Sequence, residues 1–250
     1  MDLKADLKNK PNPMSKIIYH PADSRGSADH GWLKAKHTFS FASYYNPERI
    51  HFGMLRVLND DLIAEGVGFP THPHDNMEII TIPLKGAIAH KDSMGNSSVI
   101  HKGEIQVMSA GTGIQHSEYN FSDSEILQLL QIWIFPNKKN VEPRYQQLSV
   151  NQDVTNQLHQ ILSPHPEDDG VWIHQDAWFH IGKFNTAHTI DYTIKKEGNG
   201  VYVFVIDGSV RIENHELSER DGLGISKTNQ FSIEILNEKT EILLMEIPMN

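Results

Sequence analysis

The chain has 250 residues, which is enough for one large β domain or for two domains of about 110 residues each. Its 22 basic and 32 acidic residues give a net charge of −10, and no run of Lys or Arg is long enough to follow a phosphate backbone, so direct nucleic-acid binding is not expected. Because the chain has no cysteine, disulfides, thiolate metal sites and cysteine nucleophiles are excluded, and His, Asp and Glu remain as candidate metal ligands.

The start of the chain is polar and rich in lysine. It has almost no apolar surface to bury, so we expect a flexible leader at residues 1–14. This segment lacks the apolar centre of a secretory signal peptide, and no later segment has the length of a membrane-spanning helix. These features predict a cytoplasmic protein that does not associate with membranes.

After the leader, short runs of alternating or β-branched residues recur between clusters of Gly, Asn, Asp and Pro. This pattern is typical of many short strands joined by turns. The clearest predicted strands are residues 52–58, 78–84, 104–110, 126–135, 200–206, 231–236 and 241–247. Helical periodicity is confined to short pieces such as residues 144–148. The predicted fold class is therefore all-β, as a sandwich or a barrel.

The composition changes at residues 135–147, where two prolines and a Lys/Asn cluster interrupt the strands. We place the domain connection there, which predicts one domain at residues 15–136, and a linker with a second domain at residues 137–250. A weak internal repeat supports two copies of one β-barrel design. In the first half LKGAIAH is followed by HKGEIQVMSAG, and in the second half IDGSVRI is followed by ERDGLGISKTN.

The two copies differ in their histidines. Counting back from Gly208 by the spacing that separates the first histidine pair from Gly86 leads to the region of Ile194 and Lys196. No residue comparable to the later histidine of the first half follows Gly222. The second domain is therefore predicted to lack a metal site.

Two polar pairs in the first half have the spacing of ligands on strands. Successive side chains of a strand point to opposite faces, so His72 shares a face with His74, and His116 shares a face with Glu118. If the strand continues regularly, Glu78 lies on the same face as His72 and His74, because its position differs from theirs by an even number of residues. Three imidazoles and a carboxylate suit divalent iron, manganese, nickel, copper or zinc. With four protein ligands an octahedral metal keeps two open positions, as catalytic metals do.

A single His-X-His pair is a weak signal, and the alternative is a polar surface turn. The second pair, His116 and Glu118, follows the turns at Gly86 and Gly103 in the sequence, at a separation that β-hairpins allow. This second pair favours the metal site over the surface turn. We interpret the remaining histidines as surface or hydrogen-bonded side chains: His20, His30, His37, His51, His90, His101, His159, His165, His174, His180, His188 and His215.

The segment HPHDNMEIITIPLKG resembles the first cupin motif, and GEIQVMSAGTGIQHSEYN resembles the second. The segments RGSADHGWLKAKHTFSFASYYNPE, FGMLRVLNDD, HKDSMGN and MSAGTGIQHSE are similar to the pirin family of bicupins. These blocks cover nearly all of residues 20–120, and the second half resembles the metal-free C-terminal cupin of that family. The resemblance implies two tandem cupin domains, each a jelly-roll-like β-barrel.

The resemblance to pirins also implies a mononuclear metal site held by His72, His74, His116 and Glu118. The implied metal is iron(II), with manganese, nickel, copper and zinc as alternatives. The resemblance implies that Glu78 lies next to the ligands without binding the metal. Strand parity alone would allow both Glu78 and Glu118 as ligands. Bacterial relatives are associated with cleavage of the flavonol quercetin by dioxygen. The resemblance thus implies a dioxygenase that releases carbon monoxide, with Glu118 as the general base.

Two other functions stay open at this point. Eukaryotic pirins resemble protein-binding regulators, in which the oxidation state of the iron changes a surface used by a transcription factor. The acidic balance of this chain fits a protein partner better than DNA. Alternatively, the metal is a structural clamp in a small-molecule binder. The expected partners of the enzyme are a flavonol-like substrate and dioxygen, and we expect a monomer because two cupin domains of one chain can pack against each other.

Overall fold

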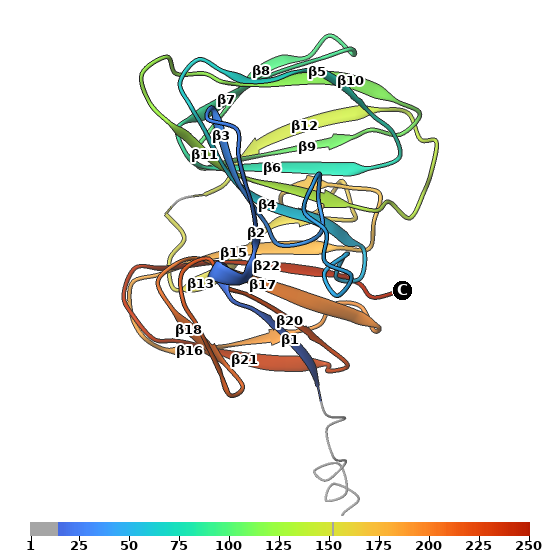
Figure 1. The fold of residues 1–250 in the computed structure, drawn as a ribbon. Helices are drawn as coiled ribbons and strands as arrows, with labels where there is room; N and C mark the ends of the chain where they lie inside the picture. The colour runs from blue at the N-terminus through green and yellow to red at the C-terminus, as the bar shows by residue number, and fades with distance from the viewer. Residues whose placement is uncertain (1–14, 152) are drawn as a thin grey trace, which may run out of the picture.

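The computed structural model describes residues 15–151 and 153–250 and is nearly all strand (Figure 1). One short 3-10 helix, η1 (Ala22–Ser24), interrupts the described strands. The predicted leader, residues 1–14, lies outside the described residues. Within the described parts of the chain, no helix has the length and hydrophobicity required to cross a bilayer.

The first half of the chain forms two facing sheets. The larger sheet has the order β12-β9-β6-β11-β4-β3-β2, and the smaller one has the order β5-β10-β7-β8. The larger sheet contains β2 (Gly26–Asp29), β3 (Leu33–His37), β4 (Leu55–Ile63), β6 (Glu78–Lys85), β9 (Glu104–Ser109), β11 (Leu127–Ile134) and β12 (Arg144–Ser149). The smaller sheet contains β5 (Gly68–His74), β7 (Ala87–Asp92), β8 (Ser97–His101) and β10 (Ile114–Asn120). We refer to this pair of sheets as the first sandwich.

The second half repeats this arrangement as the second sandwich. Its larger sheet has the order β1-β20-β17-β22-β15-β13-β14, and its smaller sheet has the order β16-β21-β18-β19. The larger sheet contains β1 (Lys16–His20), β13 (Gln157–Ser163), β14 (Val171–Trp172), β15 (Trp178–Phe184), β17 (Asn199–Asp207), β20 (Gly222–Ser226) and β22 (Thr240–Pro248). The smaller sheet contains β16 (Thr189–Thr193), β18 (Val210–Ile212), β19 (His215–Leu217) and β21 (Gln230–Ile235).

The two sandwiches share one topology, so the weak sequence repeat reflects a real structural repeat. The run β9-β6-β11-β4-β3 corresponds strand by strand to β20-β17-β22-β15-β13. Gly86 and Gly208 occupy equivalent turns and have φ values of 78° and 80°. This left-handed backbone is accessible to glycine at little cost, which explains the shared glycine in both copies.

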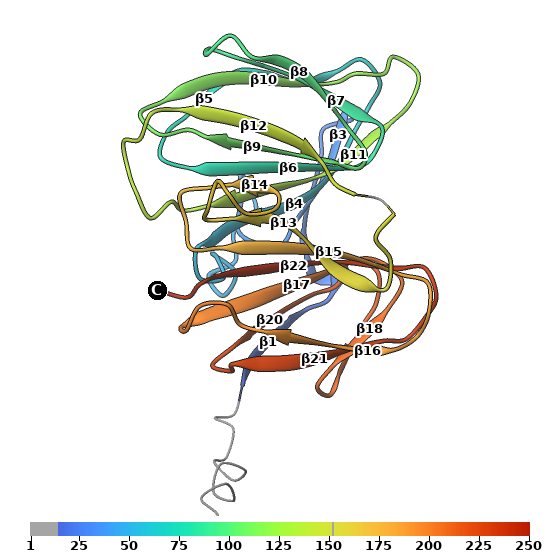
Figure 2. The same cartoon turned by 180° about the vertical axis from the view of Figure 1, so that it is seen from behind.

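The largest hydrophobic core lies between the two sandwiches, because their larger sheets face each other in the middle of the molecule (Figures 1 and 2). Side chains of a strand alternate between its two faces. Leu130 of β11 packs in this shared core with Phe204 of β17, whereas the adjacent Leu129 and Val203 pack inside their own sandwiches. Nearly continuous apolar runs are thus needed on these strands, since both faces are buried.

Residues 144–148 form part of strand β12, so the predicted helical periodicity there is wrong. Strand β12 pairs with β9 from Arg144 opposite Ser109 to Ser149 opposite Glu104 (Figure 2). The open edge of a sheet offers a full ladder of hydrogen bonds, and a run of six residues is too short for a helix to compete.

Strands at both ends of the first half extend the larger sheets. Strand β12 adds to the sheet of the first sandwich, and β1 adds to the sheet of the second sandwich beside β20. Both pairings therefore cross the predicted boundary between residues 136 and 137. The division into domains at residue 136 stays a prediction.

Candidate metal centre

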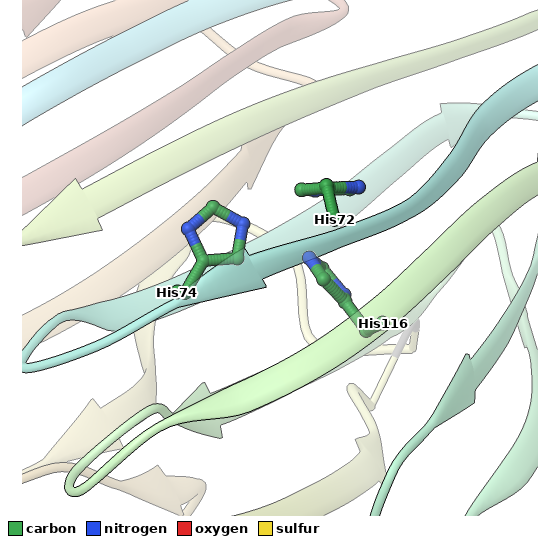
Figure 3. A group of neighbouring side chains, drawn as sticks. All are labelled: His72, His74 and His116. Carbon is green, nitrogen blue, oxygen red and sulfur yellow. The ribbon is translucent and has the colours of Figure 1, made fainter.

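Three histidines meet where strands β5 and β10 lie side by side (Figure 3). His72 lies directly opposite His116 in the antiparallel pairing, and His74 lies two residues further along β5 on the same face. The ring centroids of His72 and His116 are 4.4 Å apart, and His74 lies 4.9 Å from each of them. One potential ligand atom from each histidine lies within 4.8 Å of the others. The structure thus brings together the three imidazoles that the spacing singled out.

Pro73 separates the two histidines of β5 without disturbing the sheet. Strand β5 is an edge strand of the smaller sheet, and Pro73 is exposed. A proline is tolerated at an edge because the missing N–H would have pointed to solvent. The proline is thus part of a strand and does not mark a turn.

Two of the three imidazoles, those of His74 and His116, are held in the neutral form, which has a lone pair for a metal. Burial, and then the charge of His72, lowers the pKa of His74 to about 4. Burial and the neighbouring histidines lower the pKa of His116 to about 2. Both rings are therefore neutral at pH 7, which is the state that binds metals.

The hydrogen bonding of these rings also fits a metal ion. Both ring nitrogens of His116 are buried and have no hydrogen-bond partner among the described atoms. His72 places its Nδ1 2.8 Å from the carbonyl oxygen of Pro70, which fixes this ring and leaves Nε2 for a metal. Because unpaired buried polar atoms are costly, a bound ion is a physical reason for their presence here.

Glu118 lies beside this cluster, in a second group with His90 and His116 whose ligand atoms are also within 4.8 Å of one another. A register shift after His116 pairs Glu118 with Phe69, and the carboxylate points into the sandwich. The Nε2 of Gln131 donates to Oε2 of Glu118 at 2.9 Å, and the hydroxyl of Thr81 donates to Oε1 at 3.4 Å. Burial raises the pKa of Glu118 to about 7, despite both hydrogen bonds.

Glu78 points away from the three histidines, so the parity argument fails for this residue. The chain leaves the smaller sheet after His74 and enters the larger sheet at Glu78, which breaks the strand on which the parity depended. Ile80, on the same face as Glu78, packs in the core between the sandwiches. Glu78 accepts a hydrogen bond from Ser109 at 2.6 Å and interacts with Arg144 on that side. It therefore belongs to the interface between the sandwiches.

His90 is a residue near the site that sequence reasoning did not single out as a ligand. It is hydrogen-bonded, as predicted for this group of histidines, through Nε2 to the carboxylate of Asp92 at 3.1 Å. Its Nδ1, however, is buried and has no partner among the described atoms, and the residue lies opposite Glu118 in the sheet. The alternation of AIAHKD indicates that His90 and Asp92 share a face, but only the pairing of β7 with β10 places that face toward the centre.

A pocket of about 320 Å³ opens beside the centre, between edge strand β5 and strand β3. Its walls are mostly apolar, and its polar side chains come from both sheets of the first sandwich. Among these, His37 and Asn59 hold each other through Nδ1 and Oδ1 at 3.0 Å. The lining residues are Leu33, Ala35, His37, Phe41, Asn59, Asp61, Phe69, Pro70, Thr71, His72, His74, Glu118, Gln131 and Trp133. His74 and Glu118 both line the pocket, so it gives access to the histidine cluster and to the carboxylate.

The equivalent strands of the second sandwich carry mainly apolar side chains in place of the histidine cluster. Strands β16 and β21 correspond to β5 and β10 in the order of the smaller sheets. Tyr192 pairs there with Phe231, and Ile190 pairs with Ile233, and these side chains belong to or pack against the hydrophobic core of the second sandwich. Ile194 follows β16 instead of lying within it, so the predicted equivalence was displaced by a few residues.

Two family models match the chain: Pirin at residues 19–134, and Quercetinase C-terminal cupin domain at residues 160–247. The quercetin 2,3-dioxygenase of Escherichia coli strain K12 is 43% identical over 236 residues, which cover 93% of this chain and 99% of that protein. A pirin-like protein of Caulobacter vibrioides is 41% identical, with 90% of this chain and 97% of that protein covered.

A crystal structure of the bacterial pirin YhhW from Escherichia coli in complex with nickel(II) has a TM-score of 0.88 and 41% identity, with 93% of this chain and 99% of that chain covered. The predicted all-β fold of two tandem cupin domains is thereby confirmed. The identity extends through both sandwiches and includes the segment that carries the three histidines. The chain belongs to the pirin family.

Proposed function

We propose that this protein is a metal-dependent dioxygenase that cleaves flavonols such as quercetin with dioxygen and releases carbon monoxide. The observation that carries the proposal is the convergence of three imidazoles and a buried carboxylate at a largely apolar pocket. Relatives that align with nearly the whole chain bear the name quercetin 2,3-dioxygenase. These names favour the enzyme over the protein-binding regulator.

We assign His72, His74, His116 and Glu118 as the residues that hold the metal. Such an ion would polarise the hydroxyl and the neighbouring carbonyl of a flavonol and hold them in one orientation. Iron(II) is the proposed metal, and imidazole with carboxylate also suits manganese, nickel, copper and zinc. The crystal structure of a related bacterial pirin in complex with nickel(II) supports the binding of a divalent ion.

Glu118 has the proposed role of general base. Its carboxylate lines the same pocket as His72 and His74, where the flavonol hydroxyl would lie. The hydrogen bonds from Gln131 and Thr81 hold both carboxylate oxygens in place. Glu118 would accept the hydroxyl proton, which leaves an electron-rich flavonolate to react with dioxygen. Phe41, Phe69 and Trp133 in the pocket walls would exclude water from this reaction.

The first test is metal analysis of the purified protein together with an aerobic quercetin assay. His116→Ala and His74→Ala are expected to lower metal affinity by about 100-fold or more, since loss of an outer partner alone costs about 10–100-fold. His30→Ala changes an exposed histidine and serves as the control. Full metal occupancy in both ligand variants would contradict the assignment.

The second test concerns Glu118→Gln, which keeps the shape of the side chain and removes its basicity. Loss of a general base is expected to slow quercetin consumption by about 10²–10⁴-fold under air. Metal content is measured in the same samples, because a change in occupancy would also slow the reaction. Glu125→Gln, at an exposed position, is the matched control. Undiminished turnover by metal-loaded Glu118→Gln would rule out the role as base.

The same assays distinguish the other two functions. A protein that holds iron but cleaves no flavonol would fit the redox-responsive regulator or the structural clamp. Carbon monoxide is measured alongside quercetin loss, because its release identifies opening of the central ring. Quercetin loss without carbon monoxide would contradict the proposed reaction.

A further inference from the structure

Asp61 is a buried acid that points into the pocket beside the metal centre. It lies on the inner face of β4, between Ala35 of β3 and Leu129 of β11 in the sheet. Its exposed fraction is 4%, and its Oδ1 has no hydrogen-bond partner among the described atoms. A buried carboxyl oxygen without a partner is costly, so this position needs an explanation.

The register of the larger sheet places Asp61 away from the three histidines. Trp133 contacts His74, with ring centroids 4.9 Å apart, and Gln131 two residues earlier on β11 binds Glu118. Leu129, which pairs with Asp61, lies two residues further in the same direction. Each such step is about 7 Å along a strand. Asp61 therefore marks the part of the pocket beyond the residues that hold Glu118.

The surroundings of Asp61 leave room for a ligand. Its neighbour on β3 is Ala35, whose small side chain also lines the pocket. Phe69 and Leu33 line the pocket as apolar walls, and Phe69 packs edge-on against Trp32 with ring centroids 5.3 Å apart. By contrast, the nearby polar residues His37 and Asn59 already satisfy each other.

We propose that Asp61 binds a hydroxyl group of the substrate that lies remote from the metal, and that it thereby selects polyhydroxylated flavonols. This inference rests on the proposed function, because it assumes a flavonol in the pocket. A phenolic O–H would donate to the unpaired carboxyl oxygen of Asp61. A site of this kind rejects an analogue without the hydroxyl, since binding the analogue leaves the buried polar group unpaired.

The electrostatic environment is consistent with this role. Burial, and then the charges of Asp60 and Glu118, raises the pKa of Asp61 to about 8. The carboxyl group thus carries a proton in much of the population near neutral pH, and it can donate as well as accept a hydrogen bond. A phenolic hydroxyl can then bind at this site either as the donor or as the acceptor of the hydrogen bond.

The test measures binding of two flavonols to the metal-loaded protein without oxygen, so that no turnover occurs. Quercetin carries hydroxyl groups on both outer rings, whereas 3-hydroxyflavone carries only the hydroxyl beside the carbonyl. We expect Asp61→Leu to weaken quercetin binding by about 10–100-fold, and to leave 3-hydroxyflavone binding within about threefold of the wild type. Asp61→Asn keeps a hydrogen-bonding group and is expected to restore most of the preference. Asp207→Leu makes the same change at an exposed site in the second sandwich and is the control.

Three results would overturn the inference: equal losses for both flavonols in Asp61→Leu, no preference in the wild type, or no binding of either flavonol. The proposed function is judged separately from aerobic turnover. If binding shows a preference that depends on Asp61 but neither flavonol is cleaved in air, the proposed function fails and the inference stands. If both are cleaved and the preference does not depend on Asp61, the inference alone fails.

Discussion

Unpaired polar atoms gather on the inner faces of the first sandwich. Those near the histidine cluster belong to Asp61, His90, Gln106, His116 and Trp133. Each such atom costs about 1–3 kcal/mol when it is buried without a partner. The interior of the second sandwich is mainly apolar, and its buried Glu246 is hydrogen-bonded to Tyr192 and Asn199. A stable fold does not require unpaired polar atoms, so their concentration around the histidine cluster indicates a functional site.

Asp61 is one of these residues, and its contribution to the stability of the folded protein depends on pH. Its pKa rises from 3.8 to about 8 on folding, so the ionised form is disfavoured in the folded state. The stability contributed by the neutral carboxyl group is complete below about pH 4 and is lost as the pH rises toward 8. The other titratable groups of this region are His37 on β3, Asp60 on β4, Glu118 on β10, and His72 and His74 on β5.

We therefore expect Asp61→Asn, which cannot ionise, to gain stability relative to the wild type between pH 5 and pH 8. The gain is at most about 1.4 kcal/mol per pH unit. Urea unfolding at the two pH values measures the difference in the free energy of unfolding. Asp207→Asn, an exposed aspartate of β17, should show no such trend. A difference that is constant with pH would contradict the raised pKa.

At the level of elements, the metal centre depends on how closely β5 approaches β10. Gly68 makes this approach possible, because a Cβ at this position would lie 2.1 Å from the backbone oxygen of Glu118 and 2.5 Å from the Cα of Tyr119. Both atoms are backbone, so the strands would have to separate. The two histidines of β5 would then move relative to His116.

Gly68→Ala is accordingly expected to weaken metal binding by about tenfold, although all the ligands are kept, and to lower the free energy of unfolding by about 1–3 kcal/mol. Competition with a chelator gives the metal affinity, and urea unfolding gives the stability. Pro73→Ala, an exposed change on the same strand, is the control. Metal affinity unchanged in Gly68→Ala would show that the close approach does not position the histidines.

At the level of the whole molecule, the core between the sandwiches makes the two domains interdependent. Leu130 of β11 and Phe204, Leu243 and Met245 of the second sandwich are buried in this one cluster. Strand β1 strengthens the connection, because it precedes the first sandwich in sequence and pairs with β20 of the second. An interface of this kind resembles a domain core, so the two sandwiches should not unfold independently.

Calorimetry should show one cooperative transition for the wild-type protein. Leu130→Ala removes a fully buried side chain from the shared core and is expected to lower the free energy of unfolding by about 2–5 kcal/mol without splitting that transition. Val203→Ala, inside the second sandwich, should lower the same transition. Two transitions, of which each substitution affects a different one, would show that the sandwiches unfold separately.

The sequence alone determined the features that depend on local chemistry. Turn residues and alternation predicted the strands, the repeated glycines predicted two copies of one design, and the parity of His72 with His74 predicted their common face. Sequence segments within residues 20–120 were sufficient to indicate the pirin family. The role of these histidines as metal ligands stays a proposal.

Only the tertiary structure decided the features that depend on which strands pair. The chain changes sheets between His74 and Glu78, which turned the acid toward the other sandwich, and the pairing of β7 with β10 brought His90 to the centre. The unpaired oxygen of Asp61 likewise became visible only when β3, β4 and β11 were placed together. Alternation fixes the relative faces of residues within one strand, but it carries no information about which face meets which neighbour. That choice is made by contacts between segments far apart in the sequence.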